Sequence, residues 1–142
     1  MRKNDYLCIL ETNTTDESTI TQNYMAKVYF NSRDELIAVD IDRVAVIRAD
    51  GNYTHIIYMN KHEVTLSQGI TKVTEMLSRH QTERTRFIRI SRSVIINHVF
   101  MERIDVQRQF IVLADEQGNE IRVRASKPVL KSYKNAVVNV DN

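Results

Sequence analysis

The apolar residues of this chain occur in short runs rich in Val, Ile, Tyr and Phe, and polar turn segments separate these runs. Branched and aromatic side chains in runs of this length favour strands over helices. Between the runs lie turn-forming residues, as in Asp50–Asn52, where Gly51 suits a tight turn. We therefore expect strands over residues 28–30, 36–39, 44–47, 53–59, 63–66, 87–90, 94–96, 101–106, 110–113 and 120–124.

Helical spacing is confined to two places. In the middle of the chain, apolar residues recur at three- and four-residue intervals at Ile70, Val73, Met76 and Leu77. This pattern predicts one internal helix, with Ser67 or Thr71 as its N-cap. Pro128, the single proline, suits the first turn of a closing helix over residues 128–137, because its missing N–H is not needed there. The expected fold class is mainly β, with one internal helix and a short C-terminal helix.

The length of 142 residues fits one domain with a core of its own. Residues 1–25 are polar and indicate an N-terminal extension or linker, in which the apolar patch Tyr6–Leu10 fits either an edge strand or a flexible lead-in. We place the domain at residues 26–138 and a tail at residues 139–142.

Several functional classes find no support in the composition. Apolar runs such as Val94–Ile96 are far too short to span a bilayer, and polar residues interrupt any signal-peptide core after Met1. These features predict a cytoplasmic protein without a membrane partner. Cys8 is the single cysteine, so no disulfide forms within the chain.

No catalytic or metal site is expected either. The chain has three glycines, too few for a glycine-rich phosphate loop, and no nucleophile stands beside a base in a signature context. The four histidines His55, His62, His80 and His98 lie on different predicted elements without the spacing of zinc ligands. We expect a non-enzymatic protein that binds no metal and needs no cofactor.

Charge is distributed unevenly along the chain. Residues 1–78 carry 8 Lys and Arg against 11 Asp and Glu, a net charge of −3, whereas residues 79–134 carry 12 against 6, a net charge of +6. A positive field raises both affinity and encounter rate for polyanions. The second half is therefore expected to face phosphates or another acidic partner.

Residues 28–137 resemble the LytTR family of DNA-binding domains. The strongest match is Phe87–Asn97, which is similar to the family's signature of phenylalanine, two arginines, serine and asparagine at fixed spacing. The segment 39–47, the tripeptide Asn52–Thr54, the helix start at Leu66–Ser67 and the glycine turn at Gly118 follow the family order. One departure is Ala125–Lys127, where the family commonly has a Val-Ser-Arg-like segment, and Lys lacks the planar fork of Arg.

The resemblance implies a multi-sheet β domain that contacts DNA through loops between strands. Carried onto this sequence, it makes ten residues candidates for DNA contact: Asn52, Tyr53, Thr54, Arg89, Ser91, Arg92, Ser93, Arg108, Lys127 and Lys131. Arg92 is expected to read a base, since a guanidinium can bridge O6 and N7 of guanine. The flanking serines are expected to contact phosphate or to orient the loop.

Other members of this set have more general expected roles. Lys127 would meet a phosphate at a helix N-terminus, and Arg108 would touch the DNA backbone. Structural roles are open alternatives: ordinary hairpin chemistry at 52–54, a surface ion pair between Arg92 and an acid such as Asp105, and a turn held by Asn97.

The implied function is sequence-specific binding of double-stranded DNA by a bacterial transcription regulator, with two copies on a direct repeat. Residues 1–25 are too short for a receiver domain, so we expect none within this chain and a regulatory protein partner as one source of control. The alternative is a basic β-rich interaction module that binds an acidic protein or RNA.

Overall fold

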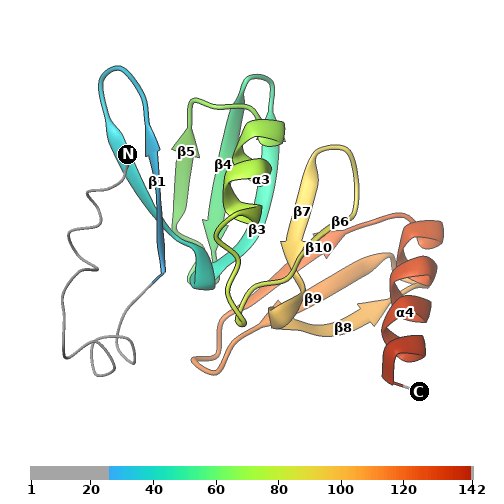
Figure 1. Ribbon diagram of the computed structural model, residues 1–142. Coiled ribbons are helices and arrows are strands. Elements are labelled where there is room, and N and C mark those ends of the chain that lie inside the picture. The colour runs from blue at the N-terminus through green and yellow to red at the C-terminus, as the bar shows by residue number, and fades with distance from the viewer. Residues whose placement is uncertain (1–25, 142) are drawn as a thin grey trace.

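The computed structural model describes residues 26–141 and contains ten strands and two α-helices in that range (Figure 1). The strands are β1 (Lys27–Asn31), β2 (Leu36–Asp40), β3 (Val44–Asp50), β4 (Tyr53–Tyr58), β5 (Glu63–Leu66), β6 (Phe87–Arg89), β7 (Val94–Asn97), β8 (Met101–Asp105), β9 (Phe110–Ala114) and β10 (Glu120–Arg124). The helices are α3 (Ile70–Ser78) and α4 (Lys127–Asp141), and two short 3-10 helices are η1 (Ile41–Arg43) and η2 (His98–Phe100).

The strands form three antiparallel sheets. The hairpin β1–β2 is one, the order β5-β4-β3-β7-β6 makes the central five-stranded sheet, and β10-β9-β8 makes a smaller third sheet. In Figure 1, α3 lies over the central sheet and α4 stands beside the third sheet. The fold class expected from the sequence is confirmed.

The central sheet separates two hydrophobic cores. The first core includes Val44 and Ile47 of β3 together with buried residues of β1, β2, β4 and α3. The second includes Ala45 and Val46 of the same strand together with residues of β7, β9 and α4. Ordinary strand alternation would place neighbours on opposite faces, but the register of β3 on β4 shifts between Val44 and Val46. This irregularity allows Ala45 and Val46 both to serve the second core.

Helix α3 packs on the first core through Val73 and Leu77, in agreement with the predicted apolar spacing. Its N-cap is Gly69, so the expectation of Ser67 or Thr71 was wrong. Gly69 has no side chain to accept a hydrogen bond, and the helix start is instead fixed by burial of its apolar face.

Helix α4 belongs to the second core through Leu130 and Tyr133. It runs from Lys127 to Asp141, longer than the predicted 128–137, so residues 139–141 of the predicted tail are helical. The Tyr133 hydroxyl lies 2.6 Å from Nδ1 of His98 in η2, which joins the helix to the end of β7. Burial lowers the pKa of His98, with a further contribution from Arg86, and raises the pKa of Tyr133 to about 12. Both groups are therefore neutral at pH 7, and the hydroxyl can donate to the imidazole nitrogen.

A buried carboxyl lies at the end of β2. Asp40 is 3% exposed, and neither of its carboxyl oxygens has a hydrogen-bond partner among the described residues. Burial raises the pKa of Asp40, opposed by the charges of Lys27 and of Arg43, whose Nη1 lies 3.8 Å from Oδ2. Because the folded state holds this proton more tightly than the unfolded chain, the contribution of Asp40 to stability falls as pH rises from below 3.8 through the raised pKa.

The predicted strands from 28–30 to 120–124 are all present, with ends that differ by up to three residues. The two 3-10 helices were not predicted, because each lasts three residues and has no sequence period. The extension at residues 1–25, including the Tyr6–Leu10 patch and Cys8, lies outside the described residues.

Asn97 fastens the end of β7 to two other parts of the chain. Its side chain is fully buried, its Nδ2 donates to the Val44 carbonyl at 3.0 Å, and its Oδ1 accepts from the backbone N–H groups of Arg86 (3.0 Å) and Val99 (3.4 Å). A buried amide with three backbone partners is a structural residue, which agrees with the turn-holding role considered for it.

We predict that Asn97→Ala lowers the free energy of unfolding by about 2–4 kcal/mol, because it leaves a buried carbonyl and two backbone N–H groups without partners. Urea denaturation followed by circular dichroism measures this loss. Asn60→Ala is the matched control. Asn60 is exposed and accepts one hydrogen bond from the His62 backbone, so this substitution should lower the free energy of unfolding by only about 0.5 kcal/mol. Equal losses of stability in the two variants would contradict the structural role of Asn97.

Candidate nucleic-acid interface

The loop between β6 and β7 carries three of the ten candidate residues. Its start is anchored by Ile90, which is buried in the second core, and the N–H groups of Ile90 and Ser91 both donate to the Val94 carbonyl at 3.0 and 3.3 Å. The Ser91 hydroxyl accepts from the Ser93 N–H at 3.3 Å, so this serine shapes the loop. Strands on either side and these hydrogen bonds constrain the backbone of the loop.

Arg89 clamps the same loop from the side. Its Nε donates to the Ser91 carbonyl at 3.2 Å, and its Nη2 donates to the Arg92 carbonyl at 2.8 Å. These bonds give Arg89 a positioning role that spacing alone did not indicate. Among the described residues the Arg92 side chain has no hydrogen bond or ion pair, and it is exposed. The alternative of an Arg92–Asp105 ion pair therefore finds no support.

The turn between β3 and β4 presents Asn52 and Tyr53. Gly51 has φ +62°, a left-handed conformation that glycine adopts without strain, and Asn52 follows it on the exposed tip. Tyr53 is 53% exposed. Thr54, by contrast, is fully buried, and its hydroxyl donates to the Gln68 carbonyl at 2.8 Å. This burial argues against the expected contact of Thr54 with DNA, because the side chain points inward and ties β4 to the start of α3.

These two loops are neighbours at one end of the central sheet. The Ala49 N–H donates to the Ser93 carbonyl at 2.8 Å, and Arg48 is opposite both Val94 of β7 and His55 of β4. Figure 1 shows the β3–β4 turn and the β6–β7 loop projecting from the same side of the molecule. The fold thus brings Asn52, separated from Arg92 by about forty residues of sequence, to the same surface.

Two carboxylates, Asp50 at this end and Glu63 at the start of β5, both contact His55. His55 lies 2.9 Å from Asp50 through Nε2 and 2.8 Å from Glu63 through Nδ1, and Nδ1 also lies 2.9 Å from the Thr65 hydroxyl. Arg48 Nη2 lies 3.7 Å from Glu63. The acids are therefore oriented by neighbours on the sheet, which limits their repulsion of an approaching polyanion.

A third group of candidates lies around the start of α4. The turn between β8 and β9 is held by Asp105, whose carboxylate accepts from the Arg108 N–H at 2.9 Å, and Gln109 there has φ +64°. The Ala125 N–H donates to the Gln109 carbonyl at 3.3 Å, so this turn lies beside the segment that leads into α4. Lys127 and Lys131 are exposed and four residues apart, which places them on one side of the helix.

Three basic residues of the third sheet were not selected as candidates from the sequence. Arg103 of β8 and Arg122 of β10 are both opposite Val112, and their guanidinium groups lie over the Phe110 ring, 5.8 and 4.6 Å from its centroid. Arg124, on the same exposed side of β10, is opposite Phe110. The period-two alternation of β10 was the available signal, since it places both of its arginines on one face.

The turn between β9 and β10 has no basic residue and is held by an acid. Hydrogen bonds from the Asn119 side chain and from backbone N–H groups lower the pKa of Asp115, which accepts at 2.8 Å from Asn119 Nδ2.

Across the described part of the chain, no group of three or more His, Cys, Asp or Glu side chains is placed to hold a metal ion. None of the helices in that part is long and apolar enough to span a membrane.

The structure is similar to a LytTr DNA-binding domain from Bacillus cereus, with a TM-score of 0.51 and 18% identity over 79% of this chain and 96% of that one. Residues 34–137 match the family model of the LytTr DNA-binding domain. The chain therefore belongs to this family. No curated protein matched the sequence.

We predict that Thr54→Val lowers the free energy of unfolding by about 1 kcal/mol and leaves duplex affinity of the folded protein unchanged, because it removes one internal hydrogen bond. Tyr53→Ala, at the neighbouring exposed position, should weaken duplex affinity at little cost in stability. Denaturation and fluorescence-anisotropy titration of one labelled duplex measure the two effects. A loss of affinity with Thr54→Val equal to that with Tyr53→Ala would restore Thr54 to the interface.

Proposed function

We propose that this chain binds double-stranded DNA sequence-specifically through the β3–β4 turn, the β6–β7 loop and the start of α4, and that it regulates transcription in a bacterium. The observation that carries the proposal is Arg92, an exposed guanidinium on a loop that Arg89 and β-sheet bonds hold in place. Membership of a DNA-binding family supplies the class of ligand.

Arg92 has the chemistry and the support needed to read a base. A guanidinium bonded to O6 and N7 of guanine is worth about 1–3 kcal/mol of discrimination against the wrong base. Because the loop backbone is already fixed, less conformational entropy is lost when the contact forms. Ser91 is exposed and Ser93 half-buried, which leaves the first better placed to meet a phosphate.

The remaining candidates provide contacts that do not depend on sequence. Lys127 lies in the first turn of α4, where unpaired backbone N–H groups favour an anion, and Lys131 and Arg108 extend the positive surface from there. Asn52 and Tyr53 supply an amide and a hydroxyl from the adjacent turn. Together these groups would supply one base reader and several phosphate contacts.

The number of copies on DNA and the source of control are proposed from the family resemblance. We infer that two copies bind side by side on a direct repeat, and that a partner protein is one source of control. The cytoplasmic location stays a prediction from the sequence.

A second candidate function rests on the outer face of the third sheet. Arg103, Arg122 and Arg124 form a patch of three arginines there, with the acidic Glu120 on the same side of β10. Such a patch suits an acidic protein or the phosphates of RNA. It differs from the first proposal because mutation of this patch, rather than of Arg92, would then abolish binding.

Arg92→Ala is the sharpest test of sequence reading. We expect the wild-type protein to enrich a repeated motif from a random duplex pool, and the variant to lose preference at one position of each repeat. Arg84→Ala is the control, because Arg84 is exposed beside Thr82, whose hydroxyl donates to Asp42 at the opposite end of β3. Enrichment of no motif by the wild type would sink the proposal, and an unchanged motif with Arg92→Ala would remove the role of Arg92.

Salt dependence separates phosphate contacts from base contacts. We expect the logarithm of the affinity for a selected duplex to fall linearly with the logarithm of salt concentration, and Lys127→Gln to reduce that slope by about 0.9, the value of one phosphate contact. Arg84→Gln should leave the slope unchanged. An affinity that stays constant between low and moderate salt would contradict a phosphate-bound complex.

A further inference from the structure

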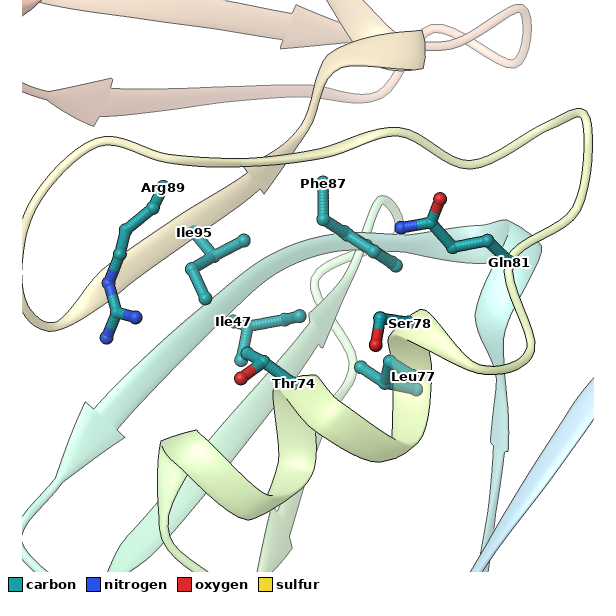
Figure 2. Close-up of a pocket in the computed structure, with 8 residues that line it drawn as sticks. All are labelled: Ile47, Thr74, Leu77, Ser78, Gln81, Phe87, Arg89 and Ile95. Atoms are coloured by element: carbon teal, nitrogen blue, oxygen red, sulfur yellow. The ribbon is translucent and has the colours of Figure 1, made fainter.

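A hollow of about 230 Å³ lies between α3 and the edge of the central sheet. Figure 2 shows the residues that line it: Ile47, Thr74, Leu77, Ser78, Gln81, Phe87, Arg89 and Ile95. A cavity of about 150 Å³ accepts a benzene-sized molecule, so this one has room for a somewhat larger ligand. None of these residues except Arg89 belongs to the predicted DNA contacts.

The floor and the rim of the hollow differ in chemistry. Ile47, Leu77 and Ile95 of the floor are buried apolar side chains, and the half-buried Phe87 ring lies against them. Ser78 and Gln81 at the rim are exposed and polar. An apolar floor that opens at a polar rim fits a ligand with a hydrocarbon body and one or two polar groups.

The strongest polar group is Arg89, which stands at one end of the hollow with Gln81 at the other (Figure 2). Of the five N–H donors of a guanidinium, Arg89 uses one on the Ser91 carbonyl and one on the Arg92 carbonyl. No acidic side chain among the described residues forms an ion pair with it. Three donors and a full positive charge remain for a ligand, and a carboxylate matches their geometry.

We propose that this hollow is the binding site of a small monocarboxylate with an apolar aromatic or aliphatic body, whose carboxylate pairs with Arg89. To pair with the free donors, the carboxylate draws the guanidinium into the hollow and away from the carbonyls of Ser91 and Arg92. Binding therefore loosens the β6–β7 loop and lowers the affinity for DNA. The lowered affinity for DNA rests on the proposed DNA-binding function, whereas the ligand site itself does not.

Binding at the site is tested without DNA. Phenylacetate and hexanoate are titrated into the isotope-labelled protein alongside 2-phenylethanol and hexanol, their uncharged counterparts. The acids should shift the amide resonances of Thr74, Ser78 and Phe87 with a Kd of about 1 mM, and the alcohols should bind at least about tenfold more weakly. If neither acid shifts these resonances at about 10 mM, the site is wrong.

Two variants localise the effect. Ser78→Leu places an apolar side chain at the rim and should abolish the shifts, whereas Thr71→Leu makes a similar change on an exposed position of α3 outside the hollow. Arg89→Gln removes the charge, so acids and alcohols should then bind alike. A retained preference for acids in Arg89→Gln would overturn the assignment of the carboxylate partner.

Coupling to DNA is measured on a duplex that the wild-type protein selects. Saturating phenylacetate should weaken duplex affinity severalfold in the wild type and in Thr71→Leu but not in Ser78→Leu. Because coupling is reciprocal, saturating duplex should raise the Kd for phenylacetate by the same factor. Resonance shifts with no change in duplex affinity would overturn the coupling alone. Failure to bind any duplex would instead overturn the proposed function and leave the ligand result standing.

Discussion

The rest of the fold depends on burial of β3 on both of its faces. Val44 and Ile47 lie in one core, and Ala45 and Val46 lie in the other, all at most 5% exposed. Fully burying a Val or Ile side chain is worth about 1.5–3 kcal/mol, so a single strand contributes to both sides of the domain. Helix α3 and the third sheet pack into the two cores to which this strand contributes.

Strand β3 is directly connected to both loops of the proposed interface. The strand ends at Asp50, and the turn that bears Asn52 follows at once, so this turn has little freedom of its own. The Ser93 carbonyl is bonded to the Ala49 N–H, and the loop that bears Arg92 is therefore fixed to the same strand. A binding group on a loop that a sheet positions is pre-organised, although the loop itself is exposed.

The strands were predictable from the sequence because branched residues, aromatic residues and turn residues act locally. The exposure of individual side chains could not be predicted in the same way. Thr54 belongs to the tripeptide 52–54 together with Tyr53. Its hydroxyl nevertheless donates to the Gln68 carbonyl, in a segment that folds back onto β4. Arg89 was assigned to DNA by spacing, whereas its bonds to Ser91 and Arg92 depend on the path of the loop. Gly69 became an N-cap because packing of α3 overrode capping preference.

Charge along the chain and charge in space give different pictures of this domain. Residues 1–78 have a net charge of −3, yet the β3–β4 turn from this acidic half stands beside Arg92 from the basic half. The nearby carboxylates of Asp50 and Glu63 are bound to His55, and Arg48 lies next to Glu63 as well. Acids that already have cationic or hydrogen-bonding neighbours oppose an approaching polyanion less than free ones. Position along the chain is therefore a poor guide to which charges lie together at this end of the sheet.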